Sequence, residues 1–345
     1  MKKKTSIQDI ASLLQVSKTA VSFVLNGKGR HYGISEALEK KILAYVHEVN
    51  YRPNSMAKGL RTGKSNTIGM MIEDISDPFF SSIARQVEEN AYKTGYRVIF
   101  GSTENDTKKT RDLLRIFQYH QVDGYIIAPS PDVEDHIREL VNDNLPVVIF
   151  DRPLENFSTP LVVIDNFEGV REAVIHMIEN GFARIGMITL ESRQVQMAAR
   201  LNAYHEILKR HHLPAYVAKI IYHEDKENSI HKIQAFLNVH HTLDAVFFAT
   251  NYIAMNGLEA IKRQGLKIGT DLGVIAFDDY NSFELFSPSI TAVAQPVKEI
   301  ADAVMQQILR QLRPSGLRTA DEIITLRTSL KIRESSRPLA RPKGG

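Results

Sequence analysis

The feature that most constrains the fold is a regular alternation of short apolar runs and amphipathic stretches between residues 65 and 337. Runs such as Val147–Phe150 and Ala245–Phe248 are continuously apolar, which is typical of strands covered on both faces of a parallel sheet. Stretches with apolar residues at helical spacing lie between them. The alternation restarts near residue 161, so it predicts an α/β body made of two parallel-sheet lobes.

The expected strands cover residues 66–72, 96–101, 124–128, 146–150, 161–164, 184–189, 217–222, 245–249 and 273–277. The expected helices cover residues 79–94, 108–120, 133–142, 168–180, 196–211, 230–239 and 253–264. We expect the first lobe to hold residues 65–163 and 296–323, and the second lobe to hold residues 164–293 and 324–337. The tail at 338–345 is rich in proline, glycine and basic residues, and we expect it to be disordered.

The N-terminal segment differs from this body in charge. Residues 1–64 hold 12 Lys/Arg and 4 Asp/Glu, whereas the remaining 281 residues hold 31 and 36. A basic head on an acidic body indicates a polyanionic partner, the alternative being a head made basic for solubility. The chain has no cysteine, no apolar stretch behind its first lysines and no run of about 18 apolar residues. We therefore expect a cytoplasmic protein that neither carries a secretory signal nor enters a membrane.

The head has the pattern of a helix-turn-helix domain over residues 1–52. Ser6 and Asp9 have the spacing of a capping box, and Ser17 is placed to begin a second helix after a tight turn. A third helix fits residues 35–49. The exposed start of the second helix carries Ser17, Lys18, Thr19 and Ser22, side chains that can reach bases or phosphates in a major groove. A plain three-helix bundle would explain the apolar spacing but not the basic surface.

A short segment at residues 53–64 joins head and body. Pro53 can end one element, and Asn54 or Ser55 can cap about two turns of helix up to Leu60. Helices shorter than about 12 residues are marginal in water, and Gly59 weakens this one further. The segment is therefore interpreted either as a conditional hinge helix that acts as a switch or as an ordinary linker.

The chain resembles the lactose/galactose repressor (LacI/GalR) family over nearly its whole length. In the head the resemblance rests on residues 7–11, 16–17, 20–22 and 24–26, on Tyr51-Arg-Pro-Asn54, and on residues 57–63. In the body it rests on residues 65–69, 74–80, 122–129, 200–204, 277–279 and 295–296. The resemblance implies a body like the periplasmic sugar-binding proteins. It also implies DNA contacts by Ser17, Lys18, Thr19, Ser22, Asn26, Tyr51, Asn54, Ala57, Lys58, Leu60 and Arg61, with Leu60 as a minor-groove wedge.

Three features of the head depart from the family pattern. Gln15 stands where the family usually has glycine, so the turn is expected to be either strained or differently shaped. Phe23 replaces a usual arginine and removes an expected DNA contact. The loop at residues 27–33 is a few residues longer than usual. Because of these departures, the family pattern does not predict the operator sequence. The expected DNA-binding role is unaffected.

Polar residues follow several expected strands of the body, where parallel α/β sheets bind ligands. They are Asp74, Ser76, Asp77, Asp151, Arg152, Asn251, Asp278 and Asp279. Carboxylate and amide acceptors with an arginine donor suit a polyhydroxylated ligand. The resemblance implies that Arg200 and Asp278 grip an effector and that Phe79 or Phe80 packs against it. The complete expected effector set is Asp74, Phe79, Phe80, Asp151, Arg200, Asn251 and Asp278. Tyr252 stands where the family usually has aspartate, which leaves the effector open.

We therefore expect a sequence-specific transcriptional regulator, a repressor, that binds a roughly palindromic operator as a homodimer under control of a sugar-like effector. A carbohydrate-binding protein without gene control is the first alternative, and an enzyme on a Rossmann-like body is the second. The head argues against the first. The lack of a glycine fingerprint, of a Gly-x-Ser-x-Gly elbow and of helical metal-site spacing in the histidine pairs argues against the second, so no cofactor or metal is expected.

Overall fold

The computed structural model describes residues 5–51, 64–154, 158–313 and 322–338, and its chain divides into two compact units at residues 65 and 66. Most of the expected hinge segment, residues 53–63, and the tail beyond residue 338 lie outside the described part. Among the described residues no helix combines the length and the apolar character needed to cross a membrane.

The head is a three-helix unit, as the sequence predicts. Helix α1 spans Ile7–Leu13, α2 spans Lys18–Leu25 and α3 spans Glu36–Glu48, with a 3-10 turn η1 at Arg30–Tyr32. Each α-helix begins at a serine cap: Ser6 forms the capping box with Asp9, Ser17 Oγ accepts from the Ala20 N–H at 3.0 Å, and Ser35 Oγ accepts from the Leu38 N–H at 3.3 Å. The helices enclose a small core of Ile10, Ala11, Val21, Val24 and Ile42.

The turn between α1 and α2 is strained at the residue that the sequence singled out. Gln15 has a φ of 55°, in the left-handed region where a Cβ atom crowds the backbone. The turn closes through a hydrogen bond from the Val16 N–H to the Ala11 carbonyl at 3.0 Å. Glycine would adopt this conformation without the steric penalty.

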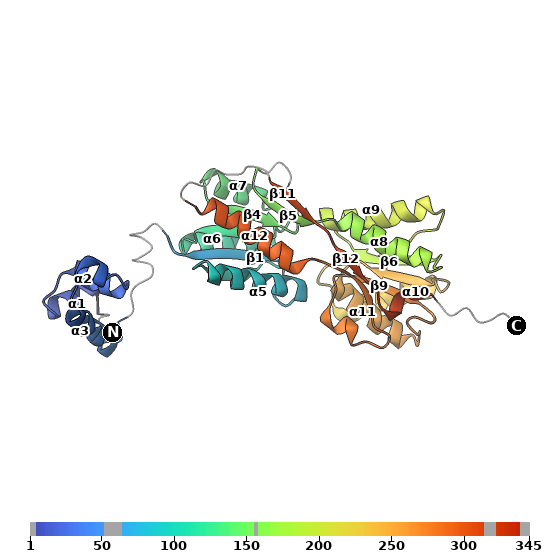
Figure 1. The fold of residues 1–345 in the computed structure, drawn as a ribbon. Helices are drawn as coiled ribbons and strands as arrows, with labels where there is room; N and C mark the ends of the chain where they lie inside the picture. Colours follow the sequence, from blue (N-terminus) through green and yellow to red (C-terminus); the bar gives the residue numbers. More distant parts are fainter. Residues whose placement is uncertain (1–4, 52–63, 155–157, 314–321, 339–345) are drawn as a thin grey trace. The chain divides into compact units, whose positions relative to one another are not determined.

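The first lobe of the body is a three-layer sandwich (Figure 1). Its sheet has the order β11-β5-β4-β3-β1-β2, and all of its strand pairs are parallel. The strands are β1 (Thr67–Ile72), β2 (Arg97–Ser102), β3 (Gly124–Ile127), β4 (Val147–Phe150), β5 (Leu161–Ile164) and β11 (Ile323–Leu326). Helices α5 (Pro78–Lys93) and α12 (Val297–Gln311) cover one face, and α6 (Thr107–Tyr119) and α7 (Glu134–Asn142) cover the other.

The second lobe repeats this plan. Its sheet has the order β12-β10-β9-β8-β6-β7, with only β12 antiparallel among the strand pairs of the described chain. The strands are β6 (Ile185–Leu190), β7 (Tyr216–Ile220), β8 (Ala245–Phe248), β9 (Gly273–Phe277), β10 (Thr291–Ala294) and β12 (Ser329–Lys331). Helices α8 (Asn166–Glu179) and α9 (Val195–Arg210) cover one face, and α10 (Lys226–Val239) and α11 (Asn251–Arg263) cover the other.

The expected fold class is confirmed, but the C-terminal segment differs from the expected layout. No strand or helix was expected after residue 277, where the structure has β10, α12, β11 and β12. Strand β11 pairs with β5 through Leu326, so the chain crosses to the second lobe a few residues after the expected boundary at 323/324. Helices α10 and α11 begin two to four residues earlier than expected, because Asp225 and Thr250 cap them.

The left-handed Gln15 generates a testable prediction. Replacing Gln15 with glycine should stabilise the head by about 1 kcal/mol, because the penalty of a side chain in this conformation is removed. Hydrogen exchange of the Ile10 and Val21 amides in the full chain should slow by about fivefold, the factor that corresponds to 1 kcal/mol. Gln15→Ala keeps the Cβ atom and serves as the control. Equal exchange in all three proteins would contradict the strained-turn interpretation.

Candidate functional site

The exposed surface of α2 carries the side chains predicted to contact DNA. Ser17, Lys18 and Thr19 are exposed at the start of the helix, and Ser22 lies one turn further on, partly exposed. Ser17 also caps the helix, so its hydroxyl oxygen is already engaged by the Ala20 N–H. Asn26 ends the helix and donates from Nδ2 to the Ser22 carbonyl at 2.7 Å. Lys18 and Thr19 are therefore the side chains whose polar groups are best placed to meet a partner.

Tyr51 takes a different position from these residues. It follows α3, its N–H donates to the Val46 carbonyl at 2.9 Å, and its half-buried ring packs on the head core. This placement gives it a role in the head's own stability. The other predicted DNA contacts, Asn54, Ala57, Lys58, Leu60 and Arg61, lie outside the described residues.

In the body, six of the seven predicted effector residues line one small cavity of about 50 Å³. They are Phe79, Phe80, Asp151, Arg200, Asn251 and Asp278. The carboxyl ends of β4, β8 and β9, the N-terminus of α5 and the first half of α9 bring them together. Asp77 and Gln295 line the same cavity and were not in the predicted set. Asp77 caps α5, accepting from the Phe79 N–H at 2.8 Å, and this capping role is the signal that could have identified it.

Arg200 is the central cation of this cavity. Its guanidinium is buried, donates from Nε to Asn166 Oδ1 at 2.8 Å, and donates from Nη1 to the Ala249 carbonyl at 2.6 Å. The same Nη1 lies 3.7 Å from Asp278 Oδ2, and the guanidinium carbon lies 3.5 Å from the centre of the Phe277 ring. A buried charge is tolerated only when it is compensated in this way. These contacts fix the guanidinium plane at the wall of the cavity.

Two aspartates, one from each lobe, line this cavity at equivalent positions of the two sheets. Asp151 follows β4 and Asp278 follows β9, which hold the same place in the two sheet orders. Both residues have a φ of 69°. Aspartate tolerates the left-handed region better than most side chains, and such strained positions gather at binding sites. Asp278 is held further by Gln295, whose Nε2 donates to Oδ1 at 2.5 Å.

The carboxylates that line this cavity outnumber the cations, and burial raises the pKa values of three of them. Burial raises the pKa of Asp77 to about 6, with a further contribution from the charge of Asp278. Burial raises the pKa of Asp151 to about 7, although Arg200 acts in the opposite direction. Burial also raises the pKa of Asp278. The cavity therefore favours a ligand that brings hydrogen-bond donors to these oxygens.

Arg152 is a second buried cation that the predicted set omitted. It donates to Glu73 and Asn105, to the Pro129 carbonyl at 3.1 Å, and from Nε to Asp151 Oδ2 at 3.1 Å. Burial lowers the pKa of its guanidinium to about 10. Its place directly after Asp151 was visible in the sequence, but its partners come from residues far away in the chain. Arg152 thus orients the Asp151 carboxylate through the hydrogen bond from its Nε.

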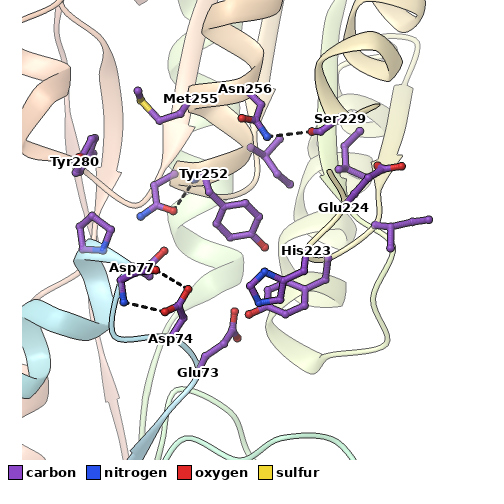
Figure 2. Close-up of a pocket in the computed structure, with 17 residues that line it drawn as sticks. Glu73, Asp74, Asp77, His223, Glu224, Ser229, Tyr252, Met255, Asn256 and Tyr280 are labelled. Carbon is purple, nitrogen blue, oxygen red and sulfur yellow. Dashed lines mark hydrogen bonds between the residues drawn. The ribbon is translucent and has the colours of Figure 1, made fainter. Parts of the chain in front are cut away.

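Asp74 is the one predicted effector residue that does not line the small cavity. It lines a neighbouring cavity of about 390 Å³, whose walls include Tyr222, Tyr252 and His223 (Figure 2). Its carboxylate accepts from the Ser76 N–H at 2.8 Å and from the Ser76 hydroxyl at 2.7 Å, so it closes the loop before α5. Tyr252, the departure from the family pattern, lines both cavities.

The raised carboxylate pKa values generate a prediction about pH. An acid whose pKa is higher in the folded than in the unfolded protein loses its proton first in the unfolded chain, so stability falls as pH rises from the unfolded to the folded pKa. The free body should therefore lose stability between about pH 4, near the ordinary aspartate pKa, and about pH 7, the raised pKa of Asp151. Replacing Asp151 with asparagine, which also tolerates a left-handed φ, should reduce that loss by more than about 1 kcal/mol.

Thermal unfolding of the full chain across this pH range measures the effect, and Asp77→Asn should act in the same direction. Asp112→Asn, at an exposed position of α6, is the matched control. A pH dependence that is the same in Asp151→Asn, Asp112→Asn and the parent would contradict the assignment of raised pKa values.

Comparison with known proteins agrees with the two-part architecture. The family model "Bacterial regulatory proteins, lacI family" matches residues 6–54, and the model "Periplasmic binding protein-like domain" matches residues 174–336. The chain is 31% identical over 333 residues to a "Ribose operon repressor" of Halalkalibacterium halodurans, covering 96% of this chain and 97% of the relative.

Solved structures show the same fold. A LacI family transcriptional regulator from Enterococcus faecium with bound ribose matches with a TM-score of 0.69 and 26% identity, covering 79% of this chain and 99% of that one. The lac repressor dimer bound to operator and the anti-inducer ONPF matches with a TM-score of 0.83 and 21% identity, covering 97% and 100%. The helix-turn-helix head, the two-lobed body and these matches together show that the chain belongs to the LacI family of bacterial transcriptional regulators.

Proposed function

We propose that this regulator is a repressor whose operator affinity is set by a small, uncharged, polyhydroxylated effector, bound by Arg200, Asp151 and Asp278 and extending into the adjoining cavity of about 390 Å³. The observation that carries the proposal is the buried cluster of one guanidinium and several carboxylates at facing strand ends. Hydroxyl groups of a sugar can donate to the carboxylates and accept from the guanidinium. Phe79 and Phe80, whose ring centroids lie 5.0 Å apart, supply an apolar wall.

The charge of the site narrows the class of sugar. Asp77, Asp151 and Asp278 line the cavity together with Glu73, against the guanidinium groups of Arg152 and Arg200. Both guanidinium groups already have carboxylate neighbours at hydrogen-bond or ion-pair distance. A phosphate or carboxylate on the ligand would meet negative charge without a cation to neutralise it. A neutral sugar therefore fits better than a sugar phosphate or a sugar acid.

The mode of action follows from the head. Two copies of a helix-turn-helix head read a roughly palindromic site when the protein is a homodimer, and the lac repressor dimer has the same fold. In this proposal the chain acts in the cytoplasm by binding DNA and ligand, without catalysing a reaction. An assay for turnover of any sugar that binds distinguishes this role from that of an enzyme.

The first prediction concerns the effector. Thermal shift of the full chain with ribose, xylose, glucose, ribose 5-phosphate and gluconate should show stabilisation by a neutral sugar and not by the two anions. Asp278→Asn should weaken binding of that sugar by about tenfold or more, since a hydrogen bond to a charged group contributes roughly 1.5–3 kcal/mol. Asp112→Asn is the matched control. Stabilisation by the anions alone would contradict the charge argument.

The second prediction concerns allosteric control. The effector should change operator affinity by a factor that corresponds to roughly 1–3 kcal/mol, and the operator must change effector affinity by the same factor. Asp278→Asn and Arg200→Ala should lose this response while basal operator binding survives. Calorimetry measures effector affinity with and without operator and operator affinity with and without effector. The operator is the duplex that the parent protein selects from a randomised library. No coupling in either direction would reduce the cavity to a passive binding site.

The third prediction concerns the recognition helix. Selection from a randomised duplex library should yield a different preferred sequence after Lys18→Ala or Thr19→Ala, because these residues are exposed at the start of α2. Lys41→Ala removes one exposed positive charge from α3 and should leave the preference unchanged. An unchanged preference in Lys18→Ala and Thr19→Ala would contradict the assignment of α2 as the reading helix.

A further inference from the structure

Two departures from the family pattern, Phe23 on α2 and the long loop at residues 27–33, contact each other directly. The rings of Phe23 and Tyr32 lie parallel, with centroids 3.7 Å apart and an interplanar angle of 4°. Phe23 lies on α2, whereas Tyr32 belongs to the long loop at residues 27–33. The substitution of the expected arginine by phenylalanine and the longer loop are therefore coupled, because the phenylalanine provides the surface on which the loop's tyrosine rests.

This stack lies on the outward side of the reading helix. Positions 22 and 23 each lie three or four residues from both 19 and 26, so the four positions share one face of α2. Val21 and Val24 lie on the other side, in the head core. Phe23 is thus next to Thr19, Ser22 and Asn26, on the surface that is predicted to meet DNA. Tyr32 extends this surface, and 52% of its side chain is exposed.

The loop is built as a fixed platform. Gly29 is buried, and a Cβ atom there would lie 3.4 Å from the side chains of Val24 and Glu39. The Lys28 N–H donates to the Phe23 carbonyl at 2.8 Å, and the Ile34 N–H donates to the Gly29 carbonyl at 3.0 Å. The first bond ties the start of the loop to α2, and the second closes the loop on itself before α3, so its side chains are held in a defined position.

The side chains that the loop presents are basic. Lys28, Arg30 and His31 are all exposed, and the His31 ring stands edge-on to Tyr32 at 5.0 Å. Arg30 lies 3.9 Å from Glu36, and both side chains are more than half exposed, so this pair contributes little to stability. The guanidinium therefore gives up little when it moves to a phosphate.

We propose that this loop, seated on the Phe23–Tyr32 stack, is a second DNA-contacting element of the head, in which Lys28 and Arg30 contact backbone phosphates and replace the cation lost at position 23. Tyr32 acts as a positioning residue: it holds the loop beside α2. The inference rests on the DNA-binding role of the head. Phosphate contacts position a protein without selecting a sequence, so the loop should affect affinity more than preference.

The salt dependence of binding provides the test. Each phosphate contact contributes about 0.9 to the slope of log K against log salt. With the duplex selected for the parent, Lys28→Ala and Arg30→Ala should each lower the slope by roughly 1 and leave the preferred sequence unchanged. Tyr32→Ala should lower the slope by more than either one, since both cations lose their platform. Tyr32→Phe, which keeps the stack, should bind like the parent.

The controls separate this inference from the function on which it rests. Lys41→Ala has the same change in charge on the same head and should keep the parent's slope. Thermal unfolding of Tyr32→Ala checks that the head remains folded. Parent-like slopes in Lys28→Ala and Arg30→Ala would overturn the proposal, even if Tyr32→Ala bound weakly, because the stack would then serve only the fold. A parent protein that selects no duplex would overturn the DNA-binding role itself.

Discussion

The body depends on compensating the buried charge of Arg200. Its guanidinium is held by Asn166 from α8, by the Ala249 carbonyl after β8 and by Asp278 after β9, above the ring of Phe277. A buried cation without these partners would cost several kcal/mol. The start of α8 and the carboxyl ends of β8 and β9 must therefore meet at the same place, and that requirement fixes the wall of the cavity.

On the first-lobe side of the cavity, three carboxyl groups, those of Glu73, Asp77 and Asp151, line the cavity with one guanidinium, that of Arg152. Asp77 and Asp151 come from the first lobe, yet the pKa of each responds to groups of the second lobe. The electrostatic balance of the cavity is thus shared by both lobes. A ligand that donates hydrogen bonds to these carboxylates satisfies both lobes at once, which is the physical basis for expecting ligand binding to favour one arrangement of the lobes.

The head departs from the family pattern at position 23 and in the loop at residues 27–33, and the two departures are in contact. Losing the expected arginine at position 23 would remove a positive charge from the DNA-facing surface. The phenylalanine found there instead supports Tyr32 at 3.7 Å, in a loop that carries Lys28, Arg30 and His31. The strained Gln15 is different, since nothing in the described structure explains why glycine is absent there.

Much of this protein could be predicted from its sequence. Serine caps placed the starts of the head helices, and the alternation of apolar runs located most strands of the body to within about two residues, because capping and periodicity are local properties. The resemblance to a known family supplied Asp151, Arg200 and Asp278 of the cavity, but not Asp77 or Arg152. The C-terminal elements were missed although α12 has apolar residues at helical spacing, such as Ile300, Val304 and Ile308.

Only the tertiary structure decided how neighbouring polar residues divide their roles. Asp278 faces the cavity, whereas Asp279 beside it is held by two hydrogen bonds from Arg333, 54 residues later. Asp77 lines both the small cavity and the larger one next to it, whereas Asp74 accepts hydrogen bonds from Ser76 and lines only the larger one. Arg152 reaches Glu73, which lies 79 residues earlier. Local sequence could not show these pairings, because each depends on where distant segments bring a partner within hydrogen-bond distance.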